Sequence, residues 1–367
     1  MYTESDLVRI AKRENNTKRS YLVVNKFQGK HIPTAPSKAL AMFGELAELV
    51  RQAYPNEKLF FIGFAETATA IGAAVSSYFD AVYMQTTREL VPKADYLFFS
   101  EEHSHATEQK LVKDELAGIV SSVDRIIFIE DEVTTGNTIL NIIQILEREY
   151  PAIKKYSVAS LLNGMTQASL TAYEKKGIAL HYLVKTDHSG YAQTADQFRG
   201  DGQYIAVNSS NVESKNIFHH QIKAYQNARR AVKTRDYEAH VDEFCACVLN
   251  QIDLTGKSSI LVLGTEEFMY PALRLGQKLE NSGKEVKCHA TTRSPIAVSS
   301  EREYPLHVRY ELRSLYDENR VTFLYDIGNY DSVIVVTDAA YFEKTGIHTL
   351  INALCIQNSE IHVIRWC

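Results

Sequence analysis

Short apolar runs alternate with longer amphipathic segments over roughly the first 185 residues. Residues 59–64 and 126–129 contain no charged side chain, and such runs favour strands buried on both faces of a sheet. Residues 36–54 place apolar side chains at helical spacing and open with Pro-Ser, which predicts a helix. Further strands are predicted at residues 22–24, 81–84, 157–162 and 178–184, and further helices at residues 67–78 and 139–146. This alternation predicts a parallel α/β sheet.

The pattern changes after residue 187. Residues 187–216 are rich in Gly, Ser, Asn, Asp and Gln, which predicts a linker, and residues 218–254 are predicted to be helical. A second alternation runs from residue 258 to the C-terminus. We therefore predict an α/β protein with two Rossmann-like parallel-sheet domains. The predicted boundaries are residues 1–200 for the first domain, 201–257 for the linker and helical region, and 258–367 for the second domain.

The second alternation repeats features of the first in the same order. A strand that ends in Gly63-Phe64-Ala65-Glu66 and one that ends in Thr86-Thr87-Arg88 are matched by Gly264-Thr265-Glu266-Glu267 and Thr291-Thr292-Arg293. A third apolar strand ends at Asp131 in the first half and at Asp338 in the second. The order predicts a divergent tandem duplication. The second copy has Thr337 where the first has Glu130, and bulky Tyr341 and Phe342 follow, so we expect its site to be decayed or retuned. Its candidate residues are Gly264, Thr265, Glu266, Arg293 and Asp338.

Composition excludes several classes of protein. Of the 367 residues, 45% are hydrophobic and 23% are charged, as in ordinary globular proteins. The net charge of −5 and the lack of a basic block argue against a nucleic-acid partner. No apolar run approaches the roughly 20 residues of a membrane span, and the polar N-terminus differs from a signal peptide. Five scattered cysteines without a C-x-x-C pair favour neither disulfides nor zinc. We expect a cytoplasmic protein with no membrane partner.

The chemistry is concentrated where the strand at residues 126–129 ends. Glu130-Asp131-Glu132 follow it directly, and Val133-Thr134-Thr135-Gly136-Asn137-Thr138 then open a helix. Adjacent carboxylates at a strand's carboxyl end can accept hydrogen bonds from vicinal hydroxyls and hold a hydrated Mg²⁺. A loop of hydroxyls and backbone N–H groups at a helix N-terminus suits a phosphate monoester. Ribose 5-phosphate has both features, although an acidic turn with a Thr N-cap would give the same residues.

At these residues the sequence resembles the type I phosphoribosyltransferases, in which an apolar strand, two acids and a Thr/Ser-Gly-Thr loop follow one another. Asn137 stands where Ser, Lys or Gly is commoner. In the second half, Thr292-Arg293-Ser294-Pro295 and residues 264–270 resemble the TRSP domain. That domain follows a phosphoribosyltransferase domain in proteins linked to bacterial tellurite-resistance and stress gene clusters. The resemblance implies transfer of phosphoribosyl from phosphoribosyl pyrophosphate (PRPP) to a base-like nitrogenous acceptor, with Mg²⁺ as cofactor.

The resemblance also implies roles for single residues. Glu130, Asp131 and Arg88 would be catalytic, and Glu130 and Asp131 would also bind Mg²⁺. The remaining PRPP contacts would come from two loops, made of Thr134, Thr135, Gly136, Asn137 and Thr138 and of Gly63, Phe64, Ala65, Glu66 and Thr67. A mobile lid would carry His103, Ser104, His105 and Lys110.

Each of these roles has a plainer alternative. Glu66 can be an ordinary helix N-terminal acid, Arg88 can form a salt bridge, and the lid can be a solvated loop. The acceptor would be contacted by residues 163–165, with residues 185–187 as a second candidate, although Asn163 can equally be a turn residue.

Two other functions stay open. A PRPP synthetase-like enzyme would also pair two such domains in one chain, and a non-catalytic regulator would bind PRPP or a nucleotide without turning it over. The second copy would shape the acceptor site or mediate dimerisation, and we expect a homodimer.

Overall fold

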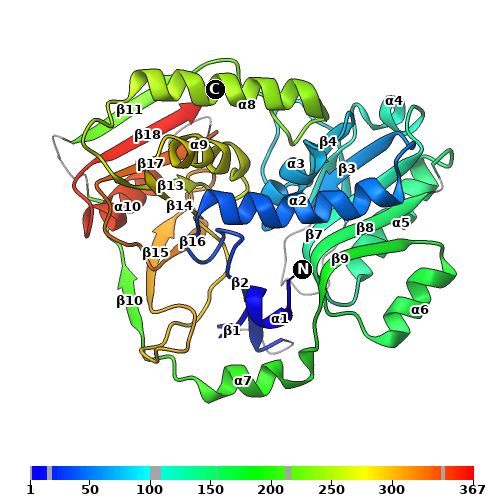
Figure 1. Ribbon diagram of the computed structural model, residues 1–367, viewed down its shortest axis with the longest axis horizontal. Coiled ribbons are helices and arrows are strands. Elements are labelled where there is room, and N and C mark those ends of the chain that lie inside the picture. Colours follow the sequence, from blue (N-terminus) through cyan, green and yellow to red (C-terminus); the bar gives the residue numbers. More distant parts are fainter. Residues whose placement is uncertain (1, 15–18, 100–108, 154, 211–215, 340–343) are drawn as a thin grey trace. The chain divides into compact units, whose positions relative to one another are not determined.

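The computed structural model describes residues 2–14, 19–99, 109–153, 155–210, 216–339 and 344–367 (Figure 1). The chain forms two compact units, each built from separate pieces of sequence. Unit 1 consists of Met1–Glu4, Leu40–Asp187 and Gln226–Ala239, and unit 2 consists of Ser5–Ala39, His188–Tyr225 and His240–Cys367. The boundaries predicted at residues 200 and 257 divide the chain into contiguous pieces, whereas these units are discontinuous.

Unit 1 is built on a six-stranded sheet of order β12-β4-β3-β7-β8-β9. The five strands other than β12 run parallel, and β12 pairs antiparallel with β4. Their bounds are β3 (Leu59–Gly63), β4 (Val82–Gln85), β7 (Arg125–Val133), β8 (Tyr156–Asn163), β9 (Ala179–Lys185) and β12 (Val232–Lys233). Every residue of β3 and β8 is buried, as expected for strands inside a parallel sheet.

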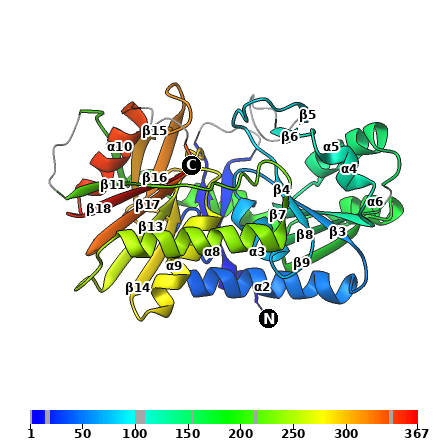
Figure 2. The same ribbon diagram turned by 90° about the horizontal axis from the view of Figure 1, so that it is seen from above.

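Helices and a hairpin complete unit 1. Helix α3 (Thr69–Ser76) is wholly buried and packs on β3 and β4, beside which it lies in Figures 1 and 2. Its close approach needs two glycines, because a Cβ on Gly72 would lie 2.9 Å from the Cα of Gly63. The other elements are α4 (Leu116–Val120), α5 (Asn137–Glu149), α6 (Gln167–Lys175) and the antiparallel pair β5 (Tyr96–Phe99) and β6 (Gln109–Val112).

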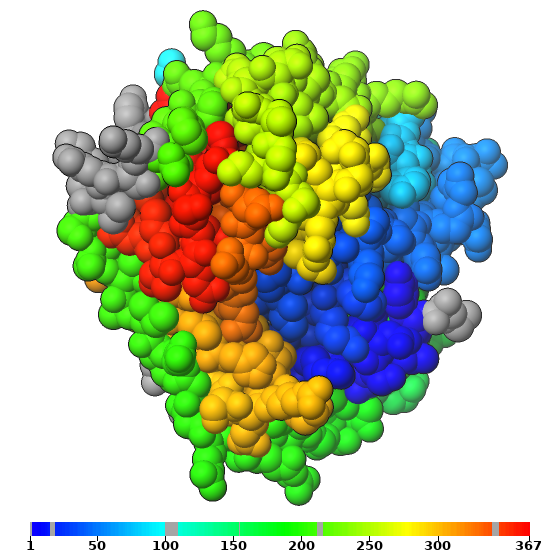
Figure 3. Space-filling view, turned by 60° about the vertical axis from the view of Figure 1, so that its left-hand side comes forward, coloured from blue at the N-terminus to red at the C-terminus, as the bar shows by residue number. Residues whose placement is uncertain are grey.

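Unit 2 is built on a five-stranded parallel sheet of order β11-β18-β17-β13-β14. The strands are β11 (Ile217–Ile222), β13 (Ser259–Gly264), β14 (Glu285–Ala290), β17 (Ser332–Thr337) and β18 (Ile361–Trp366). Helices α9 (Tyr270–Asn281) and α10 (Lys344–Cys355) belong to the same unit. Figure 3 shows the C-terminal segments of this unit, orange and red, side by side on one face.

Two smaller sheets belong to unit 2. One has the order β10-β15-β16, formed by β10 (Gln203–Ala206), β15 (Val308–Arg313) and β16 (Val321–Tyr325). The other is a hairpin of β1 (Val8–Lys12) and β2 (Tyr21–Asn25), near the turn η1 (His188–Gly190) and helix α7 (Tyr191–Gln197). Helix α1 (Glu4–Leu7) and the long helices α2 (Pro36–Ala53) and α8 (Thr234–Gln251) each have one part in each unit.

The two main sheets share a strand order, which confirms the predicted pair of α/β units with parallel sheets. Reading β4-β3-β7-β8-β9 in unit 1 against β14-β13-β17-β18-β11 in unit 2 matches the strands one by one. The fifth strand differs in origin, because β9 follows β8 in the chain whereas β11 precedes β13. Residues 217–222 were predicted, apart from the first, to be helical. They form a strand because all six pair in register with β18.

The predicted linker also contains structure, namely η1, α7 and β10. In the part of the chain that the structure describes, no helix combines the length and apolarity required to cross a membrane.

Candidate active site

The predicted site residues of unit 1 lie at or just beyond the carboxyl ends of three neighbouring strands of its sheet. Gly63, the last residue of β3, lies opposite Gln85 of β4 and Ile129 of β7. The segments after β3 and β4 and the last residues of β7 therefore lie at one edge of the sheet, where parallel α/β sheets bind their ligands. The sequence places the candidate PRPP-binding residues 63–67, Arg88 and the acids on these segments.

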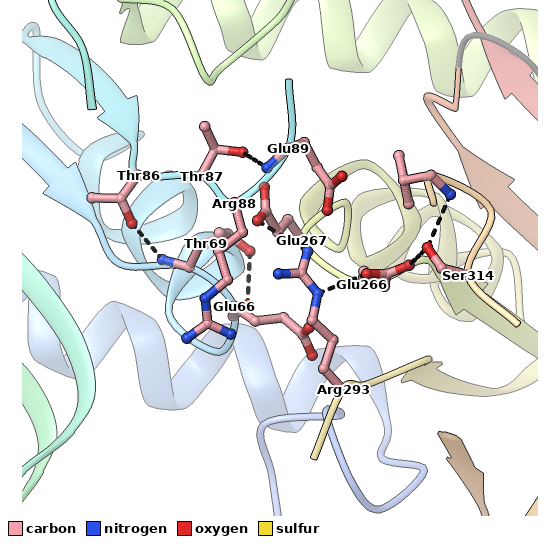
Figure 4. A network of polar contacts seen from close by, with 12 residues as sticks. Glu66, Thr69, Thr86, Thr87, Arg88, Glu89, Glu266, Glu267, Arg293 and Ser314 are labelled. Carbon is pink, nitrogen blue, oxygen red and sulfur yellow. Dashed lines mark hydrogen bonds and ion pairs between the residues drawn. The ribbon is translucent and has the colours of Figure 1, made fainter. Parts of the chain in front are cut away.

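The loop after β3 is held by hydrogen bonds with the residue that follows β4 and with β6. The Ala65 N–H donates to the Thr86 hydroxyl oxygen (2.8 Å), and the Gln109 side-chain amide donates to the Ala65 carbonyl (2.6 Å). Thr86 also donates to Gln109, and the peptide between Ala65 and Glu66 is cis. Figure 4 shows Thr69 and Thr86 beside this loop, with the Thr69 hydroxyl 3.5 Å from the Glu66 carbonyl oxygen. The backbone of the loop is thus fixed before any ligand arrives.

The three acids lie at the end of β7 and are partly buried. Burial raises the pKa of Asp131 to about 6, and the charge of Glu132 acts in the same direction. A hydrogen bond from the Thr67 hydroxyl opposes this shift in the pKa. Thr67 therefore links the loop after β3 to the acid at the end of β7.

The loop between β7 and α5 depends on a glycine and on a distant tyrosine. Gly136 has φ of 77°, in the left-handed region, and its carbonyl accepts a 2.6 Å hydrogen bond from the buried Tyr173 hydroxyl. A Cβ on Gly136 would collide with the Tyr173 ring. Burial and the charge of Glu130 both raise the pKa of Tyr173. Tyr173 was missed from the sequence, because it comes from α6 and nothing in its surroundings marks it.

The hydroxyls of this loop stand at the start of α5. The Asn137 N–H donates to the Thr135 hydroxyl oxygen (3.3 Å), and the helix proper then runs for 13 residues. Thr134, Thr135 and Thr138 are partly exposed. Exposed hydroxyls and N–H groups at a helix N-terminus suit a phosphate.

Arg88 lies where β4 has ended. Thr87 and Lys110 exchange backbone hydrogen bonds of 2.8 and 2.9 Å, and the Lys110 ammonium lies 3.4 Å from the Arg88 carbonyl. Lys110, a predicted lid residue, is therefore tied to the segment that carries Arg88. The other predicted lid residues, His103, Ser104 and His105, lie outside the described residues.

The predicted acceptor loops are connected by one lysine. The Lys185 ammonium donates to the carbonyls of Asn163 (3.1 Å), Met165 (2.9 Å) and Thr186 (3.3 Å). The buried Asn163 side chain accepts from the Met165 N–H (3.0 Å), as a turn residue does. Lys185 and Asn163 thus fix the loops after β8 and β9 in a defined shape.

The corresponding edge of unit 2 holds a network of buried ion pairs. The Glu266 carboxylate accepts from Arg293 (2.7 Å) and Arg320 (2.9 Å) and from the Ser314 hydroxyl, as Figure 4 shows for Arg293 and Ser314. Glu267 accepts a longer contact from Arg293 (3.3 Å). Thr265 and Asp338 belong to a neighbouring cluster. The Tyr316 hydroxyl oxygen lies 2.7 Å from the Thr265 hydroxyl oxygen and donates a 2.7 Å hydrogen bond to the Asp338 carboxylate.

Magnesium was predicted at Glu130 and Asp131. Among the residues that the structure describes, no group of three or more His, Cys, Asp or Glu could hold a metal by itself. Mg²⁺ in phosphate chemistry is usually bound through one or two carboxylates together with substrate phosphates and water. Two partly buried carboxylates at one strand end supply the protein's share of such a ligand set.

Solved structures similar to this chain include several adenine phosphoribosyltransferases. The enzyme from Rhodothermus marinus is 14% identical, with a TM-score of 0.36 over 50% of this chain and 96% of that chain. The Saccharomyces cerevisiae enzyme, solved with adenine and an iminoaltritol bisphosphate, is 13% identical, with a TM-score of 0.32 over 48% and 94%. The Trypanosoma brucei enzyme, solved with AMP, pyrophosphate and ribose 5-phosphate, is 14% identical, with a TM-score of 0.34 over 49% and 76%. A comparison with curated proteins found no match.

Two family models match this chain. Residues 7–189 match the phosphoribosyl transferase family, and residues 227–354 match the TRSP domain, which is described as C-terminal to that transferase. Both resemblances noted in the sequence are thereby confirmed, and together the matches cover most of the chain. The chain belongs to the family of phosphoribosyltransferases, enzymes of the glycosyltransferase class, that carry a C-terminal TRSP domain.

Proposed function

We propose that unit 1 is a Mg²⁺-dependent phosphoribosyltransferase that moves the phosphoribosyl group of PRPP to a base-like nitrogenous acceptor and releases pyrophosphate. The observation that carries the proposal is the hydrogen bond from Thr67 to Asp131. It joins the loop of residues 63–67, which we assign to the pyrophosphate, to the acids that we assign to the ribose hydroxyls. A ligand with a pyrophosphate beside a ribose would meet both.

Each loop then has a role set by its chemistry. Glu130 and Asp131 accept hydrogen bonds from the ribose hydroxyls, and residues 134–138 bind the 5-phosphate at the N-terminus of α5. The N–H groups of residues 63–67 and the guanidinium of Arg88 bind the pyrophosphate, to which an arginine can donate two parallel hydrogen bonds. Bound Mg²⁺ would neutralise charge on the leaving pyrophosphate, held through Glu130 and Asp131.

The reaction exchanges one bond for another at C1 of the ribose. The lone pair of an acceptor nitrogen forms the new C1–N bond while the C1–O bond breaks, and its electrons leave with pyrophosphate. Positive charge develops at C1, so catalysis depends on alignment and on stabilising the leaving group. The acceptor's N–H proton passes to water or to an ionised carboxylate of the site. Asn163 and Lys185 shape the loops on the acceptor side.

The first test is Asp131→Asn, assayed for pyrophosphate release from PRPP with a panel of purine and pyrimidine bases. We expect at least a 100-fold loss of activity with an unchanged circular dichroism spectrum, because the amide cannot act as an anion. Glu149→Gln, at the exposed end of α5, is the matched control and should keep full activity. Unchanged turnover in Asp131→Asn would overturn the site assignment.

Two alternatives predict different products. The shared strand order of the two units favours testing a PRPP synthetase-like reaction, which would transfer pyrophosphate from ATP to ribose 5-phosphate and yield AMP. A regulator would bind PRPP tightly and release no pyrophosphate with any acceptor. A stress-linked biosynthetic pathway in the cytoplasm and a homodimer complete the proposal, and light scattering tests the dimer directly.

A further inference from the structure

The loop after β13 in unit 2 is built like the loop after β3 in unit 1. The Thr86 N–H donates to the Gly63 carbonyl (2.9 Å), and the Thr291 N–H donates to the Gly264 carbonyl (3.1 Å). The Thr86 hydroxyl oxygen accepts from the Ala65 N–H, and that of Thr291 accepts from the Glu266 N–H (3.0 Å).

A third pair of bonds completes the correspondence. The Thr87 N–H donates to the Lys110 carbonyl, and the Thr292 N–H donates to the Phe323 carbonyl (2.9 Å). These matches align Ala65 with Glu266 and Arg88 with Arg293. The position that carries a methyl group in unit 1 therefore carries a carboxylate in unit 2.

That carboxylate is surrounded as a bound anion would be. Its two oxygens accept from two guanidinium groups and one hydroxyl, and the Glu266 side chain is only 2% exposed. A third cation lies behind the loop, where the buried Lys30 ammonium donates to the carbonyls of Glu266 (2.8 Å) and Thr291 (2.9 Å). Glu266 has φ of 50°, a conformation that side chains with a Cβ rarely adopt and that costs free energy.

We propose that Glu266 is a built-in replacement for a bound anion. Unit 2 retains the anion-binding loop but fills it with its own carboxylate, so the wild-type unit does not bind phosphate or pyrophosphate there. Removing the carboxylate leaves Arg293, Arg320 and Ser314 around a vacated volume, which becomes a site for inorganic phosphate. That the loop after β3 binds an anion rests on the proposed function. The phosphate site expected on removal of the Glu266 carboxylate rests on the contacts of unit 2 alone.

The test is anion rescue of Glu266→Ala in the full chain. This variant should melt below the wild type, because Arg293 and Arg320 lose the buried carboxylate that accepts their shortest hydrogen bonds. Inorganic phosphate should then raise its Tm by on the order of 5 °C more than it raises that of the wild type, since ligand stabilisation grows with occupancy. Glu266→Gln keeps the volume filled and is the matched control, so its phosphate response should equal the wild type's. No extra rise in Glu266→Ala would overturn the proposal.

A second measurement decides the matter if Glu266→Ala does not fold. Calorimetric titration of the wild-type chain with Mg-pyrophosphate should give one site, lost in Arg88→Met and kept in Arg293→Met. Two sites, or one site lost in Arg293→Met, would overturn the inference about Glu266. No site at all would instead count against the proposed function of unit 1, while supporting the exclusion of anions from unit 2.

Discussion

At the scale of single residues, the ionised Asp131 side chain lowers the free energy of unfolding. Its pKa of about 6 lies above the ordinary value of 3.8, because burial and Glu132 disfavour the ionised form. Ionisation therefore costs the folded state more than the unfolded chain. This cost is fully present above pH 6, shrinks as the pH falls, and is gone below about pH 4.

Replacing Asp131 should therefore stabilise the protein while it removes activity. We expect Asp131→Asn to raise the free energy of unfolding at pH 8 by about 1–3 kcal/mol, since one pKa unit corresponds to about 1.4 kcal/mol. The amide oxygen can still accept the hydrogen bond from Thr67. Urea unfolding of both proteins at pH 8 and pH 4.5 measures the effect, and the gain should be smaller at the lower pH. A wild type that is the more stable protein at pH 8 would contradict the direction of the pKa shift.

The residues at the end of β7 were recognisable because they are contiguous. An apolar strand, its acids and its Thr-Gly loop stand within residues 126–138, so one stretch of sequence identifies all of them. Tyr173 could not be found in this way. It lies 37 residues beyond Gly136, and only the packing of α6 brings its hydroxyl to that carbonyl.

At the scale of elements, the turn from β7 into α5 depends on that tyrosine. The hydrogen bond from the Tyr173 hydroxyl holds the Gly136 carbonyl at the start of the helix. Tyr173→Phe removes this bond but retains the ring. We expect a loss of about 1 kcal/mol in the free energy of unfolding, because a buried hydrogen bond to this carbonyl is lost and only the Leu140 N–H still donates to it. If residues 134–138 bind the 5-phosphate, the KM for PRPP should rise several-fold while kcat changes little.

The matched control for this prediction is Tyr150→Phe at the other end of α5. Both variants lose one hydroxyl, but Tyr150 is partly exposed and follows the last turn of the helix. Urea unfolding and initial-rate kinetics with varied PRPP measure both effects. An equal rise in KM for the two variants would argue that helix stability, rather than the loop, sets PRPP binding.

Element boundaries differed from the predictions where pairing extended them. The strand predicted at residues 126–129 continues to Val133, because Glu132 and Val133 pair with Leu162 and Asn163 of β8. A polar strand end is not visible in a pattern of apolar residues. The sequence of β11, Ile217–Ile222, likewise shows no clear alternation, and its pairing with β18 near the C-terminus decides its structure.

At the scale of the whole molecule, the presence of two units could be predicted from the sequence, but the chain segments that make up each unit could not. Repeated motifs in one order indicated two similar sheets. The segment from Ser5 to Ala39 belongs to unit 2, however, through contacts across most of the chain's length. Ala11, Leu22 and Val24 pack in one buried cluster with Ile296, Val298 and Tyr325. Such long-range packing leaves no local trace, since the same apolar residues would fit the core of either unit.

This arrangement predicts how two fragments of the chain should behave when they are produced separately. A fragment of residues 1–200 ends near the boundary of the transferase family match but lacks the C-terminal half of the cluster around Ala11 and Ile296. We expect this fragment to expose apolar surface and aggregate when it is produced alone. The complementary fragment, residues 201–367, lacks Lys30 and the β1–β2 hairpin and should be similarly compromised. Co-expression should restore a soluble complex, because the two pieces together supply the complete core of unit 2.

Size-exclusion chromatography of each fragment and of the co-expressed pair measures this. A monomeric, well-folded fragment 1–200, with residues 5–39 protected from hydrogen exchange, would show instead that the N-terminal segment finds its partners in the first half of the chain.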